Sequence, residues 1–276
     1  MHGLKHLLGI GRVKISTLRN PSLTPNFFTA LVPMANVRFK LSLVLCCLAS
    51  TCMLARAAPA TAEWFADLYG GATYTTRSDA TLVLRAPNAT NHIFYNVKWD
   101  GSSLVGGRAG YWFETVPWFG MGLDAFRFYP DIPTQTISGT IQGVTQPVTL
   151  KAIDYSVTAV AFDVVRLRVP LRQSQEFPKG QLQPYLAVGP ALFFTRATNT
   201  LNGELDTKTA TDTSLGIKAG AGASWQLLKH MAVFGEYRFT HFRAEPVFNS
   251  TISSLRVPLE SDINTHHFLG GISVRF

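Results

Sequence analysis

Cysteine is almost missing from this sequence of 276 residues. The three cysteines, Cys46, Cys47 and Cys52, all lie within the first 57 residues, which we expect to be removed from the mature protein. The mature chain would then have no thiol. This excludes a disulfide framework, a cysteine-ligated metal site and a thiol nucleophile.

Excess positive charge is also missing once those first residues are set aside. The whole chain has a formal net charge of +8. Seven of its cations, and no acid, lie before residue 58: Lys5, Arg12, Lys14, Arg19, Arg38, Lys40 and Arg56. Subtracting 7 from 8 leaves +1 for the remainder. The sequence pI of about 9.6 therefore does not point to a nucleic-acid partner, and we expect none.

No apolar run is long enough to predict a membrane-spanning helix. The uncharged run from 41 to 54 falls short of the ~20 residues that a helix needs to cross a bilayer. It follows a basic stretch and precedes Ala55-Arg56-Ala57, which is typical of a secretory signal peptide over 34–57 with cleavage after Ala57. Cleavage after Ala60 and an uncleaved anchor are the alternatives. We interpret residues 1–33 as an over-extended N-terminus or a long leader.

Residues 58–276 contain many short segments in which apolar and polar residues alternate. A period of two residues is typical of strands with one apolar face, and we predict eight of them. The predicted strands are 63–75, 102–113, 118–129, 153–169, 182–195, 213–227, 231–242 and 263–276. Each is at least as long as the ~9–11 tilted residues that cross a bilayer.

The predicted connections alternate between short and long. Short or moderate links fall near 114–117, 170–181 and 228–230, and long polar links near 76–101, 130–152, 196–212 and 243–262. This alternation is typical of outer-membrane barrels, with short periplasmic turns and long extracellular loops. We therefore predict an all-β fold, an eight-stranded antiparallel up-and-down transmembrane β-barrel. A soluble secreted sandwich is the alternative fold.

Eight charged residues are predicted on the strand faces opposite the apolar ones. Inside a narrow barrel, such charges must pair with one another because burial of an unpaired charge is costly. We predict an interior ion-pair network of Asp67, Arg108, Asp124, Asp163, Lys218, Glu236, Arg238 and Arg275. Aromatic residues near strand ends are predicted to form two girdles at the membrane interfaces: Trp64, Tyr74, Phe113, Trp118, Phe128, Tyr129, Phe194, Trp225 and Phe276.

Four segments carry a resemblance to a known family. Residues 183–190, 216–222, 236–242 and the terminal strand resemble the small bacterial outer-membrane β-barrels, the porin-like or OmpA-like transmembrane domains. The resemblance implies Sec-type export to the outer membrane of a Gram-negative envelope. It also implies contact with lipid and lipopolysaccharide, and an assembly signal at Phe276 that the barrel-assembly machinery reads.

The resemblance predicts architecture better than activity. The segment 238–242 is similar to a His-bearing segment of lipid A deacylases, which makes His241 the one weak catalytic candidate. Position 243, however, is Arg where a nearby Ser nucleophile is needed. His266 and His267 point to opposite strand faces, and we expect neither a metal site nor a cofactor. We expect a non-enzymatic structural or surface-interaction role, with the loops as the site for any surface ligand. A lipid A hydrolase and a narrow channel for small or hydrophobic solutes are the alternatives.

Overall fold

The computed structural model describes residues 63–83, 90–199, 209–249 and 256–276, so the predicted leader, signal peptide and Ala57 cleavage site lie outside the described residues. Thirteen strands form in these residues: β1 (Glu63–Thr75), β2 (Ser78–Leu82), β3 (His92–Val97), β4 (Ser102–Trp112), β5 (Phe119–Phe128), β6 (Gln135–Ile141), β7 (Val144–Leu150), β8 (Ile153–Arg168), β9 (Leu182–Asn199), β10 (Thr209–Leu228), β11 (Met231–Ala244), β12 (Val247–Asn249) and β13 (Arg256–Arg275). Within the described residues, no helix has the length and apolarity to cross a membrane.

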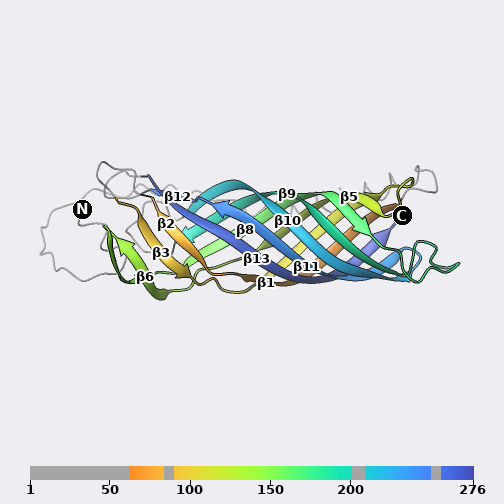
Figure 1. The fold of residues 1–276 in the computed structure, drawn as a ribbon, viewed down its shortest axis with the longest axis horizontal. Helices are drawn as coiled ribbons and strands as arrows, with labels where there is room; N and C mark the ends of the chain where they lie inside the picture. Colours follow the sequence, from red (N-terminus) through yellow and green to blue (C-terminus); the bar gives the residue numbers. More distant parts are fainter. Residues whose placement is uncertain (1–62, 84–89, 200–208, 250–255) are drawn as a thin grey trace, which may run out of the picture. The chain divides into compact units, whose positions relative to one another are not determined.

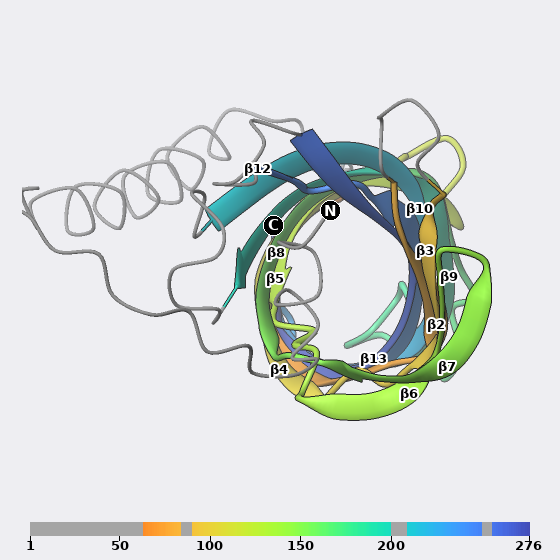
Figure 2. The ribbon, with the colours of Figure 1, turned by 90° about the vertical axis from the view of Figure 1, so that its left-hand side faces the viewer.

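Eight of these strands close into a ring. Their hydrogen-bonded order is β1-β4-β5-β8-β9-β10-β11-β13, and β13 pairs with β1 to complete the circle. Every pairing is antiparallel, and the ring is seen from the side in Figure 1 and along its axis in Figure 2. Closure satisfies backbone groups that would otherwise face lipid without a hydrogen-bond partner. The predicted eight-stranded up-and-down barrel is confirmed.

The outer surface of the ring is apolar because alternate residues of each strand point away from the axis. Leu68 of β1 is 63 % exposed and Leu215 of β10 is 70 % exposed, although both are large and aliphatic. The other strands of the ring also expose large apolar side chains. So large an apolar surface is typical of a protein surrounded by lipid and not of a soluble protein. Short connections join the strands at the end that carries Glu63 and Phe276. In outer-membrane barrels that end faces the periplasm.

The opposite, extracellular end contains more strand than the sequence predicted. β13 begins at Arg256, ahead of the predicted start at 263, and β2, β3, β6 and β7 form within the predicted loops 76–101 and 130–152. β13 pairs with β2, β2 with β3, β3 with β6, and β6 with β7. We call these four additional strands the outer sheet. These strands are short, and their buried side chains, such as Leu82, Phe94 and Val148, belong to the same apolar cluster as residues of the ring.

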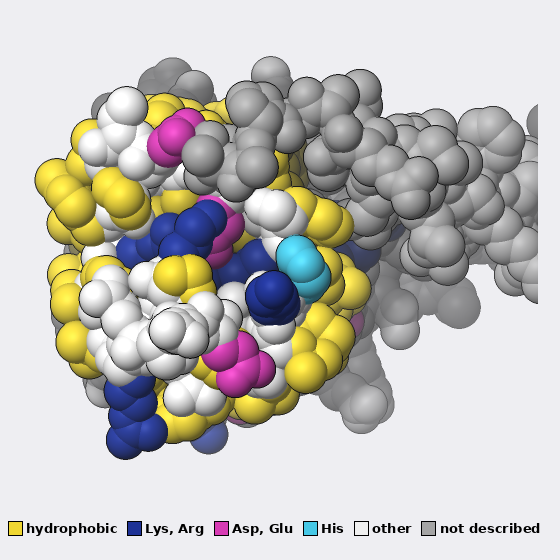
Figure 3. Space-filling model, turned by 90° about the vertical axis from the view of Figure 1, so that its right-hand side faces the viewer, with side chains coloured by type: hydrophobic (Ala, Val, Ile, Leu, Met, Phe, Trp, Pro, Cys, Tyr) yellow, Lys and Arg dark blue, Asp and Glu magenta, His cyan; other side chains and the backbone are white. Residues whose placement is uncertain are grey.

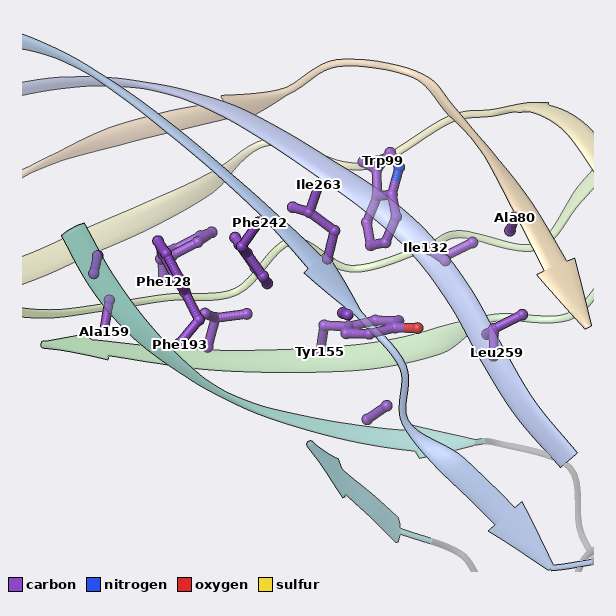
Figure 4. Packing of buried hydrophobic residues seen from close by; sticks show 14 of the residues in the cluster. Ala80, Trp99, Phe128, Ile132, Tyr155, Ala159, Phe193, Phe242, Leu259 and Ile263 are labelled. Atoms are coloured by element: carbon purple, nitrogen blue, oxygen red, sulfur yellow. The ribbon is translucent and has the colours of Figure 1, made fainter. Parts of the chain in front are cut away.

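The extracellular half of the barrel interior contains a large cluster of buried apolar side chains. Figure 4 shows buried side chains from β5, β8, β9, β11 and β13 that meet across the lumen, and the rings of Phe193 and Phe242 stack 4.0 Å apart. Phe128 belongs to this core and is fully buried, so its predicted place in an interfacial girdle is wrong. By contrast, Trp64 and Trp118 are half exposed on the outer surface.

Candidate functional site

The central charged residue of the barrel interior is Arg108 on β4. Its NH2 and Nε lie 2.7 Å and 2.8 Å from Oδ2 of Asp67, its direct neighbour on β1. Its NH1 lies 2.7 Å from Oε2 of Glu236 on β11, a strand that is not adjacent to β4. Arg108 therefore ties together strands on different sides of the lumen. Tyr185 of β9 donates a second hydrogen bond to Glu236, at 2.8 Å.

Asp124 on β5 gathers a second set of interior charges. Its Oδ2 lies 2.7 Å from Nζ of Lys218 and 2.9 Å from NH2 of Arg238, and the Tyr69 hydroxyl donates to its Oδ1. Lys218 also reaches Oδ1 of Asp163, at 2.5 Å. These side chains are almost fully buried, so each charge is neutralised by a neighbour and not by water.

Two interior cations on β8, Arg166 and Arg168, were not predicted from the sequence. The register of β8 shifts between Ala161 and Val165, where a bulge leaves Val164 and Val165 both exposed. A bulge inserts one residue and reverses the inward and outward phase beyond it. Arg166 therefore turns inward, and its NH1 lies 3.1 Å from Oδ2 of Asp163. The doublet of consecutive apolar residues at 164–165 was the available signal.

With Arg166 included, the middle of the barrel is balanced in charge. We call this set the central network. It consists of four carboxylates and four cations: Asp67, Asp124, Asp163, Glu236, Arg108, Arg166, Lys218 and Arg238. Seven of these eight residues were predicted from the sequence. The eighth predicted residue, Arg275, lies elsewhere.

Arg275 belongs to a separate group at the periplasmic end, which we call the periplasmic cluster. Its NH1 lies 3.2 Å from Oε1 of Glu63 and 2.6 Å from Oε1 of Gln183, while its NH2 donates to Oγ of Ser224 at 2.9 Å. Arg168 shares the same partners, with NH2 2.7 Å from Oε2 of Glu63 and NH1 3.2 Å from Oε1 of Gln183. Glu63 was missed because it is the first residue of its strand.

The weak catalytic candidate, His241, lies on the outer surface of β11. Its Nδ1 is 2.7 Å from Oδ1 of Asn264 on β13, which is the hydrogen-bond partner that the described residues provide. Arg243 forms ion pairs with Glu260 and, at 3.0 Å, with Glu245. The described contact of the His241 side chain is therefore with an amide oxygen, and the Arg at position 243 is occupied by ion pairs.

His92 was placed in a loop by the sequence, but it lies in β3 with only 1 % of its surface exposed. Burial lowers the pKa of the imidazole because the protonated ring loses hydration. The folded pKa then lies below the unfolded value near 6.5, so the unfolded state binds more protons. Neutral His92 therefore contributes its full stability above the unfolded pKa near 6.5, and this contribution is lost as the pH falls from there toward the folded pKa.

We therefore expect the outer sheet to open more readily at pH 5.5 than at pH 7.5. Amide hydrogen exchange of β2 and β3, corrected for the intrinsic effect of pH, measures this opening. The His92→Phe variant should lose the difference, since it has no group to protonate there. Equal pH dependence in both proteins would show that His92 is not responsible.

In the described part of the chain, no group of three or more His, Cys, Asp or Glu side chains is arranged to hold a metal ion. The charged interior is instead made of direct cation–carboxylate pairs. These pairs join side chains of different strands across the barrel interior.

Comparison with known proteins agrees with this architecture. Residues 45–276 match the sequence pattern of the family described as "Outer membrane protein beta-barrel domain". No curated protein matches the sequence. Among solved structures, the chain is similar to the outer membrane protein OprG from Pseudomonas aeruginosa, with a TM-score of 0.50 and 12 % identity over 78 % of this chain and 96 % of that one.

Two further solved structures show the same kind of likeness at lower scores. Neisserial surface protein A has a TM-score of 0.40 and 14 % identity, with coverage of 79 % of this chain and 98 % of its own. The attachment invasion locus protein Ail of Yersinia pestis, crystallised with the heparin analogue sucrose octasulfate, has a TM-score of 0.38 and 9 % identity, with coverage of 77 % and 99 %. The closed ring and the family match over residues 45–276 together assign the chain to the outer membrane protein beta-barrel domain family, and it is a protein of the bacterial outer membrane.

Proposed function

We propose that this protein is a closed scaffold of the outer membrane that presents its outer sheet to ligands at the cell surface. Two features support the scaffold. The central network fills the middle of the lumen with paired charges, and the apolar core fills the extracellular half. An eight-stranded barrel is narrow enough for its own side chains to fill it.

The observation that carries the surface role is a neutral face on the outer sheet, rich in hydroxyl groups. Cross-strand partners point to the same side of a sheet, and the pairs Thr136–Thr149, Ser138–Pro147 and Thr140–Thr145 place their side chains together. We call this the hydroxyl face, and it consists of Tyr95, Thr136, Ser138, Thr140, Thr145 and Thr149. β3, β6 and β7 contain no Asp, Glu, Lys or Arg.

The hydroxyl groups on this face are already arranged in rows. Thr140 and Thr145 have their Oγ1 atoms 2.9 Å apart, Thr136 and Thr149 3.3 Å apart, and the Tyr95 hydroxyl is 3.2 Å from Thr140. A row of fixed hydroxyls beside an exposed aromatic ring suits a neutral sugar, which offers hydroxyls for hydrogen bonding and apolar C–H faces for the ring. We therefore propose uncharged glycans as the ligand class.

Strand addition is less well supported, although β7 is paired only with β6 among the described residues. Pro147 lies in the middle of β7, and a proline within a sheet directs its missing N–H to the open edge. That edge therefore lacks a donor that an added strand would need. Binding on the face avoids this obstacle.

A pair of Thr→Lys variants tests the glycan proposal. The refolded protein in nanodiscs is applied to immobilised neutral glycans, with sulfated glycans as a second set. Thr145→Lys, on the hydroxyl face, should weaken neutral-glycan binding at least about tenfold because it adds a strongly hydrated charge. Thr115→Lys, in an exposed turn at the periplasmic end, should bind like wild type. Equal binding by both variants, or a wild type that binds no neutral glycan, would contradict the proposal.

Planar-bilayer recording tests the scaffold. We expect no reproducible conductance steps from the refolded protein, because the lumen is filled. Stable single-channel steps would contradict the scaffold proposal and would indicate a narrow channel for small or hydrophobic solutes.

We also propose that the protein is not an enzyme. Lipid A from cells with wild-type protein, with His241→Ala and without the protein should give the same mass spectrum. Loss of an acyl chain that requires His241 would establish a lipid A hydrolase instead.

The remaining partners are proposed from the barrel surface. Lipid and lipopolysaccharide are expected against the exposed apolar belt, and the barrel-assembly machinery is expected at β13 and Phe276. The Phe276 side chain is 42 % exposed, and its backbone N–H donates to the carbonyl of Trp64 at 3.0 Å.

A further inference from the structure

The buried charges of the described residues do not add up to zero. Six buried cations face five buried carboxylates. The central network accounts for four of each kind and is neutral. The surplus therefore lies in the periplasmic cluster, where Arg168 and Arg275 share the single carboxylate of Glu63. Lys179 adds to the imbalance, since its half-exposed side chain also reaches Glu63, at 3.3 Å.

A neutral side chain stands where a second anion would be expected. Oε1 of Gln183 accepts hydrogen bonds from both Arg168 and Arg275, at 3.2 Å and 2.6 Å. An amide oxygen satisfies donors but does not neutralise charge. Two arginines, held side by side in a barrel interior, thus keep one uncompensated positive charge, and this is costly where water is excluded.

A small cavity lies next to this surplus. The centre of a water-sized particle can occupy about 10 Å³ of it, which leaves room for one small particle. Four of the lining residues are Arg108, Arg166, Arg168 and Arg275, and Asp67 is the one carboxylate among them. Figure 3 views the end of the molecule that carries the C-terminus, where Lys and Arg side chains gather in the centre of the face inside a largely hydrophobic rim.

Two residues that line this cavity each have an unused hydrogen-bond donor. The Nε atoms of Arg166 and Arg275 are buried and have no hydrogen-bond partner among the described residues. Both side chains are less than one-tenth exposed. Asp67 does not remove the surplus, because its Oδ2 is already held by Arg108. Its Oδ1 has no hydrogen-bond partner among the described residues, and its negative charge disfavours an anion beside it. We therefore expect the anion beside Arg168 and Arg275.

From the charge surplus, the cavity and the two free donors we infer that the periplasmic end of the barrel binds a small monovalent inorganic anion of the size of chloride. The anion would neutralise the pair of arginines that Gln183 bridges and would accept hydrogen bonds from the free N–H groups. This site is independent of the hydroxyl face, which lies at the opposite end of the molecule.

Thermal unfolding of the refolded barrel in detergent tests the inference. Sodium chloride is exchanged for sodium gluconate at constant ionic strength, so that screening stays the same. A ligand that binds only the folded state raises the unfolding midpoint with its concentration. We expect an upward shift of about 5 °C from chloride-free buffer to saturating chloride. Equal midpoints in both salts would mean that the cavity holds a water molecule only, and would overturn the inference.

Two Gln→Glu variants locate the effect. Gln183→Glu places a fixed negative charge between Arg168 and Arg275, so its midpoint should no longer depend on chloride. Gln226→Glu is the matched control, since Gln226 is buried at the same end but does not line the cavity, and it should keep the wild-type dependence. Chloride dependence that persists in Gln183→Glu would overturn the site.

Because Gln183→Glu can fail to refold, a direct measurement on wild-type protein accompanies it. Crystals grown in bromide should give an anomalous-scattering peak within hydrogen-bonding distance of the Arg168 or Arg275 guanidinium. A well-ordered cavity with no peak would overturn the inference without any variant.

Discussion

Gly271→Val is expected to prevent closure of the barrel. Gly271 lies on β13 opposite Tyr69 of β1, in the pairing that completes the ring. A Cβ added at Gly271 would meet the carbonyl oxygen of Leu68 and would stand 2.7 Å from Cβ of Tyr69. β1 would have to move away from β13, and the hydrogen bonds of this pairing would be lost. In lipid, backbone groups without partners each cost several kcal/mol.

The measurement is the shift in electrophoretic mobility between unheated and boiled samples, which reports a folded barrel. Gly271→Val should lack the fast-migrating folded form. The adjacent Gly270→Val is the control, because its added Cβ has only the carbonyl oxygen of Phe234 nearby, at 3.6 Å. Gly270→Val should fold like wild type. A folded Gly271→Val barrel would show that the β1–β13 pairing tolerates a wider separation than this structure has.

Arg238→Leu is expected to give the largest loss of stability among single changes within the central network. Arg238 is completely buried, forms an ion pair with Asp124, and donates hydrogen bonds to Glu236 and Tyr69. Removal of one partner from a buried ion pair leaves the other charge uncompensated, and this typically costs about 3–5 kcal/mol. We expect this loss in the free energy of urea unfolding in detergent or lipid, while the protein still inserts.

Arg243→Leu is the matched control for this measurement. Arg243 also pairs with carboxylates, but its side chain is 55 % exposed. Exposed ion pairs contribute about 0–1 kcal/mol, so the control should unfold close to wild type. If Arg238→Leu unfolds at the wild-type urea concentration, the central network does not hold the barrel together.

Much of the barrel could be predicted from the sequence because a strand has a period of two residues. That period is local, so it assigns a face to a residue without any knowledge of its partners. Asp67 and Leu68 are adjacent, and their different character alone predicts that one points inward and the other outward. The same rule placed seven members of the central network in the interior.

The rule fails wherever the phase changes, because a phase change depends on pairing between strands. The bulge in β8 turned Arg166 and Arg168 inward. Phe128 follows the inward phase of β5, and only the packing against the opposite strands shows that this half of the lumen is apolar. The outer sheet could not be predicted from the sequence either, because strands this short depend on pairing and packing with the rest of the fold.

By itself, the sequence determined the number of strands in the ring, the apolar outer face and the identity of most interior charges, since each follows from local alternation. Only the tertiary structure decided which charges pair. Arg108 reaches Glu236 across the lumen, and Arg275 joins Glu63 and Gln183 far from it in the chain. Register and ring closure bring these residues together, and the surplus positive charge at the periplasmic end becomes visible only when each cation has been matched with its carboxylate.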